Sequence, residues 1–136
     1  MAAGLISAGD LGGRVPQPLT KENEPAVIRA FADGLASQGM APLAGCTPEG
    51  LARELVDNVS RWSFASKVES LKGRPALVIT SDDGSGPSSE AFASGLVKAG
   101  NNRVMTIHLT TDHSYSDKRI ELSAEVRQWL QTIQPK

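Results

Sequence analysis

The sequence has little of the residue types that mark several common protein classes. It contains one cysteine, Cys46, in 136 residues, which excludes an internal disulfide framework because such a framework needs pairs. This cysteine and the two histidines form no cluster with metal-ligand spacing, so we expect no zinc site and no other cofactor. Aromatic residues make up 4% of the chain and are not interleaved with basic runs. We therefore expect no nucleic-acid partner.

An excess of one charge and long apolar runs are also missing. Fourteen basic and fifteen acidic residues give a formal net charge of -1, which offers no electrostatic footprint for nucleic acid. The apolar opening MAAGLISAGDLGG lacks a basic leading segment and is too short to span a bilayer. We expect no signal peptide, no membrane anchor and, with a single free thiol, a reducing cytoplasmic setting.

The length suits one ordinary domain, because the chain can bury one core but not two independent ones. We predict a single domain, 1–136, in three parts. Residues 1–13 form a core strand and loop, residues 14–72 a helical insertion, and residues 73–136 a core of strand, helix, strand and helix.

Two helices are predicted within the insertion, where prolines punctuate the chain and no strand pattern occurs. The first is expected to begin near Asn23 and to end at Gly39, with an apolar face formed by Val27, Ile28, Phe31 and Leu35. The second is expected after the N-cap candidate Thr47, with an apolar face formed by Leu51, Leu55, Val59 and Trp62. Trp62 is accordingly predicted to be a core residue before it is a pocket residue.

A regular alternation of elements predicts an α/β fold. The apolar run 2–8 is typical of a buried strand, and further strands are expected at 76–80 and 103–109. The helix predicted at 88–99 lies between these last two, and such a connection joins parallel strands. A final helix is expected from about Asp117, with an apolar stripe of Leu122, Val126, Trp129, Leu130 and Ile133.

Acidic residues and a histidine follow consecutive predicted strands. Asp82 and Asp83 follow the strand at 76–80 after one intervening serine, and His113 follows the strand at 103–109. The carboxyl ends of parallel strands meet at one edge of a sheet, where ligands and catalytic groups gather. A carboxylate there can orient an imidazole and stabilise its cation. The alternative is that both aspartates are turn residues beside Gly84.

These residues resemble the C-terminal part of α/β-hydrolase-fold esterases and peptidases. In that family the acid follows the penultimate strand in a G-x-x-D-x-x-x-P-like setting, which matches Asp83 and Pro87, with Thr80 in place of the usual glycine. The family's histidine lies in the loop after the last strand, which matches His113 in TTDHSYSD. The opening AAGLISAGDLGG is similar to the preceding core strand, and the helical stretch occupies the place of the family's lid. The resemblance implies a partial α/β-hydrolase fold of about three parallel strands flanked by helices, with a helical lid-like insertion.

The family's nucleophile has no counterpart in the sequence. Its serine lies on a G-x-S-x-G turn between a strand and a helix, and that motif is absent. Ser7, in LISAG, lacks the first glycine and is followed by a loop pattern, and Ser85, in DGSGP, lies in the loop of the acid itself. We favour neither as a nucleophile, so the chain resembles the second half of a hydrolase.

The remaining polar candidates have simpler interpretations. His108 falls within a predicted strand, Asp112 suits a turn, and Cys46 has no basic neighbour that would lower its pKa. The glycines around Ser85 precede a helix, but the P-loop lysine is absent. We therefore predict Asp83 and His113 as the catalytic residues, and no others.

Three functions remain open from the sequence. The chain is expected to be an α/β-hydrolase-like segment that carries the acid and histidine of a triad, is inactive alone and needs a complementing N-terminal half for ester or amide hydrolysis. Alternatively it is a non-catalytic binding or assembly domain derived from a hydrolase, or a reduced hydrolase that acts alone. The apolar strand at 2–8 has no charged protection, and such edges pair. We therefore expect a homodimer or other homo-oligomer, or the complementing half, as partner, and a small ester or amide as substrate.

Overall fold

A computed structural model describes residues 1–38 and 45–134, and these form two compact units. One unit comprises residues 1–10 and 64–136, and the other comprises residues 11–63. The sequence predicts that residues 1–136 form a single domain, and this remains a prediction. Gly39, the predicted end of the first helix, lies outside the described residues.

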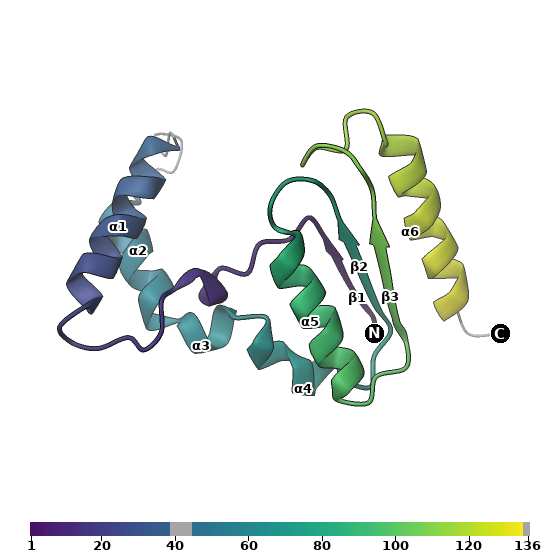
Figure 1. The fold of residues 1–136 in the computed structure, drawn as a ribbon, viewed down its shortest axis with the longest axis horizontal. Coiled ribbons are helices and arrows are strands. Elements are labelled where there is room, and N and C mark those ends of the chain that lie inside the picture. The colour runs from purple at the N-terminus through teal and green to yellow at the C-terminus, as the bar shows by residue number, and fades with distance from the viewer. Residues whose placement is uncertain (39–44, 135–136) are drawn as a thin grey trace. The chain divides into compact units, whose positions relative to one another are not determined.

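The first unit contains a three-stranded parallel sheet, which confirms the predicted α/β class (Figure 1). Its strands are β1 (Ala3–Ile6), β2 (Ala76–Thr80) and β3 (Val104–His108), in the order β1-β2-β3. All five residues of β2 are buried, as expected for a central strand of branched and apolar side chains. The prediction of 2–8 for the first strand is too long, because Ser7 turns into the left-handed region with φ 40°.

Alternate residues of the strands face two helices on opposite sides of the sheet (Figure 1). Helix α5 (Gly86–Lys98) packs Phe92, Ala93 and Leu96 on Ala76 and Val78. On the other face, helix α6 (Arg119–Ile133) packs on the sheet with a cluster formed by Leu77, Ile79, Leu109, Tyr115 and Trp129. The short helix η2 (Ala65–Lys67) leads into α4 (Val68–Leu71), which packs on the first face through Val68 and Leu71.

The ends of the two long helices differ slightly from prediction. Helix α5 begins at Gly86 with Pro87 in its first turn, a position that proline favours because the missing N–H has no helical partner there. Helix α6 begins at Arg119, two residues after the predicted start at about Asp117, whose carboxylate accepts a hydrogen bond from the Thr111 hydroxyl in the preceding loop. Leu130 is 43% exposed, so the predicted apolar stripe of α6 is narrower than the sequence indicates.

The second unit is helical. It contains η1 (Gly12–Arg14), α1 (Glu24–Ser37), α2 (Pro48–Asp57) and α3 (Val59–Trp62). A core of Ile28, Ala52 and Val56 joins α1 to α2. The predicted N-cap is confirmed, since the Thr47 side chain accepts a hydrogen bond from the Gly50 amide at 3.0 Å. Gly12 is required where η1 meets α3, because a Cβ there would lie 2.4 Å from the Val59 carbonyl oxygen.

The prediction of one continuous second helix is wrong. The helix breaks at Asn58, whose side-chain amide donates to the Glu54 carbonyl at 2.8 Å, and α3 continues as a separate turn. Trp62 therefore does not continue the apolar face of α2 that contains Leu55. It is 36% exposed and is not a core residue.

Candidate Asp-His site

The parallel register brings the ends of β2 and β3 to one edge of the sheet. Thr80, the last residue of β2, is the register partner of His108, the last residue of β3. Beyond them the Leu109 amide donates to the Thr80 carbonyl, and the Asp82 amide donates to the Thr111 carbonyl, both at 3.0 Å. These bonds continue the pairing into the two loops, so side chains thirty residues apart in sequence can meet.

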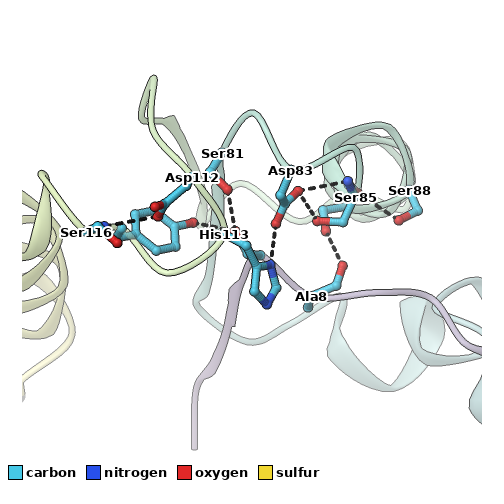
Figure 2. A network of polar contacts seen from close by, with 11 residues as sticks. Ala8, Ser81, Asp83, Ser85, Ser88, Asp112, His113 and Ser116 are labelled. Carbon is cyan, nitrogen blue, oxygen red and sulfur yellow. Dashed lines mark hydrogen bonds and ion pairs between the residues drawn. The ribbon is translucent and has the colours of Figure 1, made fainter. Parts of the chain in front are cut away.

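The structure joins the two predicted site residues directly. Nδ1 of His113 lies 2.7 Å from Oδ2 of Asp83. Figure 2 shows the two side chains pointing toward one another. The Asp83 side chain is 5% exposed, whereas the His113 side chain is 72% exposed. A buried carboxylate thus holds one nitrogen of an imidazole that is otherwise open to solvent.

Asp83 is fixed by the start of α5. Its Oδ1 accepts hydrogen bonds from the Ser85 hydroxyl at 2.6 Å and from the Ser85 amide at 2.8 Å. Gly84 makes this turn possible, because its φ of +79° lies in a region that side chains with a Cβ rarely adopt. The carboxylate therefore has a defined orientation toward His113.

The same contacts keep Asp83 ionised. The Ser85 hydroxyl bond lowers the pKa of this carboxyl far below its ordinary value, and the bonds from His113, the Ser85 amide and Ser7 add to the effect. Burial opposes this shift, since it penalises the charged form, but the hydrogen bonds outweigh it.

An ionised carboxylate can only accept, so the His113 nitrogen that faces it carries a proton. The neutral ring then has its lone pair on Nε2, on the side of the ring away from Asp83 (Figure 2). Within the first unit, residues 1–10 and 64–134, no other hydrogen bond to the His113 ring is found. The imidazole can therefore take a proton from a group outside these residues.

Ser7 is bonded to groups other than the imidazole of His113. It follows β1, has a positive φ of 40° and is 8% exposed. Its hydroxyl oxygen lies 2.8 Å from the Ser81 hydroxyl oxygen and 2.7 Å from that of Tyr115. These partners occupy Ser7 within the protein, and Ser85 is likewise bonded to Asp83.

A second aspartate and histidine pair lies at the same edge. Nε2 of His108 is 3.3 Å from Oδ1 of Asp82, and Nδ1 of His108 is 2.9 Å from the Thr80 hydroxyl oxygen. Both members are about half exposed, with 49% for His108 and 56% for Asp82. This is a solvated surface pair, in contrast to the buried carboxylate of Asp83.

The remaining polar candidates of the sequence, Asp112 and Cys46, are not bonded to Asp83 or His113. Asp112 accepts a hydrogen bond from the Ser116 amide at 3.0 Å, which is the geometry of a turn (Figure 2). The backbone and side-chain bonds from Ser116 lower the Asp112 pKa. Cys46 is exposed. Within the described part of the chain, no three His, Cys, Asp or Glu side chains are grouped as metal ligands would be.

A groove of about 710 Å³ lies between α5 and β3, and His108 is among its lining residues, but Asp83 and His113 are not. Among the residues that the structure describes, no helix has the length and apolar character needed to cross a membrane.

Sequence reasoning found the pair but missed what surrounds it. Tyr115 was not considered, although it is the one tyrosine of the chain and lies two residues after His113. Ser81 likewise lies two residues before Asp83. This spacing does not distinguish a buried hydroxyl from a solvated one, so the sequence carries no signal that singles out either residue.

Comparisons with protein-family models, with curated proteins and with solved structures find no match to this chain.

Proposed function

We propose that this chain supplies the acid and the base of a serine-type hydrolytic site for esters or amides, and that the nucleophile comes from a complementing hydrolase half. The observation that carries the proposal is the 2.7 Å contact between Nδ1 of His113 and the buried Asp83 carboxylate. In a Ser-His-Asp triad the carboxylate fixes the tautomer and the other nitrogen removes the serine proton.

The burial of Asp83 argues against an incidental surface ion pair. Surface pairs contribute little to stability and need no special support. Asp83 is 5% exposed and is held by two bonds from Ser85. A carboxylate withdrawn from water and aimed at an exposed imidazole is the arrangement that acid-base chemistry needs.

The contacts of Ser7 and Ser85 support a nucleophile that comes from outside this chain. Ser7 and Ser85 are bonded to other groups, and neither is hydrogen-bonded to His113. An acid and a base without a nucleophile cannot carry out acyl transfer by the triad route. In this proposal Asp83 and His113 are the catalytic residues that the chain contributes.

In the described part of the chain, β1 pairs with a strand on one side only, and its other side supports a partner strand. The amides of Ala3 and Ser7 donate toward β2, to the carbonyls of Pro75 and Ile79. Because successive residues of a strand alternate, the N–H and C=O groups of Gly4 and Ile6 point away from β2. A parallel strand added there would deliver its own following loop to the edge where His113 lies.

An assembly domain is the second candidate, and the same edge favours it. A bare parallel edge pairs readily with another copy of the chain. In that case the Asp83 and His113 pair would be a structural remnant. The exposed Cys46 fits a reducing, cytoplasmic setting for either function.

A fluorophosphonate probe separates these candidates. The chain would be treated with the probe alone and after mixing with an α/β-hydrolase half that carries a G-x-S-x-G turn, followed by peptide mass mapping. We expect labelling of the added serine in the mixture only, lost with His113→Ala and retained with the matched control His108→Ala. Labelling of a residue of this chain alone would contradict the need for a second half, and no labelling in the mixture would favour the assembly domain.

A further inference from the structure

Three buried hydroxyl groups meet beside the Asp83 and His113 pair. They belong to Ser7, Ser81 and Tyr115, which are 8%, 4% and 3% exposed. The Ser7 oxygen is the centre, at 2.8 Å from that of Ser81 and 2.7 Å from that of Tyr115. We call these three residues the hydroxyl cluster.

The cluster connects three loops at the carboxyl ends of the strands. Ser7 follows β1, Ser81 follows β2, and Tyr115 lies in the loop after β3. Ser81 is two residues before Asp83, and Tyr115 is two residues after His113. The loops that carry the acid and the base are thus both attached to Ser7.

The backbone is strained at both ends of one of these bonds. Ser7 has φ 40° and Tyr115 has φ 53°, and these are the two non-glycine residues found with positive φ among the described residues. Such conformations persist only where surrounding interactions hold them, and they concentrate at functional sites. Here the Ser7 to Tyr115 hydrogen bond joins the two strained residues to each other.

The buried hydroxyls of the cluster serve as hydrogen-bond partners for one another. Ser7 bonds to both Ser81 and Tyr115, and a hydroxyl has one donor and two acceptor sites with which to do so. Every member is then satisfied, which agrees with the lack of unsatisfied buried side-chain polar atoms among the described residues.

We propose that Ser7, Ser81 and Tyr115 are positioning residues that hold the Asp83 carboxylate against Nδ1 of His113, and thereby keep the proton of the neutral imidazole on Nδ1. The inference rests on the proposed function for its catalytic meaning. Ser7 accordingly acts through the two loops that carry Asp83 and His113, to which its bonds with Ser81 and Tyr115 attach it.

The test is the tautomer of His113, read from the ring ¹⁵N chemical shifts of the labelled chain at a pH where the ring is neutral. It needs no partner and no substrate, so its outcome is separate from that of the probe-labelling experiment. The variants are Tyr115→Phe, which removes one hydroxyl, and Ser7→Gly, which removes the central hydroxyl and also permits the positive φ. Ser70→Ala is the matched control, since it removes a hydroxyl that bonds the Lys67 carbonyl.

The wild-type protein is expected to have the Nδ1–H tautomer as the dominant form at His113. Tyr115→Phe and Ser7→Gly are expected to shift it to a mixture in which Nε2–H dominates, with the His108 signals and the Ser70→Ala spectrum unchanged. Retention of the Nδ1–H form in both variants would overturn the inference. A change at both histidines would also overturn it, because that result would indicate general loosening of the fold. Ser7→Gly keeps the test decisive if Tyr115→Phe fails to fold.

Discussion

At the scale of single residues, Asp83 links stability to pH. Its pKa is lowered in the folded protein, first by the Ser85 hydroxyl, so its bonds stabilise the fold fully above the ordinary aspartate pKa of about 3.9. That contribution is lost as the pH falls through the lower, folded pKa.

Asp83→Asn should therefore lose stability at neutral pH, and the difference from wild type should narrow below about pH 4, where the unfolded chain begins to bind the proton. The free energy of unfolding would be measured in urea between about pH 6 and pH 2, in a Trp62→Phe background. Trp129, which packs on the sheet, then reports the first unit alone. A difference that stays constant over this whole range would contradict the linkage.

The Asp83 and His113 pair could be predicted from the sequence, but the residues that surround it could not. Asp83 and His113 stand out because each follows an apolar run that reads as a strand, and strand ends converge in a parallel sheet. Ser7 and Tyr115 are recognised only by their positive φ and mutual contact. A hydroxyl has no sequence pattern that distinguishes a buried partner from a solvated residue.

At the scale of elements, helix α5 is held on the sheet by one narrow face of buried side chains. Leu96 is fully buried against Ala76 and Val78, whereas the next residue, Val97, is 58% exposed. Leu96→Ala should lower the free energy of unfolding by about 2 to 5 kcal/mol, because it removes buried methyl groups and leaves a cavity. Val97→Ala, the matched control, should change it by less than about 0.5 kcal/mol. Equal losses in urea denaturation would show that α5 does not pack as described.

Element types followed from the sequence better than element ends. The strands at β2 and β3 and the helix between them were predicted from apolar patterning, and the sheet order confirms their parallel pairing. The break at Asn58 was missed, because a side chain that bonds the backbone of the preceding turn competes with the helix without disturbing the apolar spacing. Trp62 was misassigned for that reason.

At the scale of the whole molecule, β1 is the feature that concerns partners. Its four residues carry no charge, and Ile6 is 42% exposed. Gly4 contributes no side chain that could shield the edge, and nothing lies within 4 Å of where its Cβ would be. Natural proteins protect such edges with charges, prolines or covering loops.

We therefore predict that the isolated chain self-associates through β1, and that Ile6→Lys weakens this association. A lysine at an exposed edge position resists pairing because an added strand and its side chains would cover the lysine and remove its charge from water. The measurement is the molar mass by sedimentation equilibrium across the micromolar range, with Val97→Lys as the control for an added charge on α5. We expect Ile6→Lys to shift the chain toward monomer at least about tenfold in dissociation constant, which corresponds to about 1.4 kcal/mol, with the control unchanged. A wild-type chain that is monomeric throughout the range would contradict self-pairing through β1. The partner strand at this edge would then have to come from a different protein.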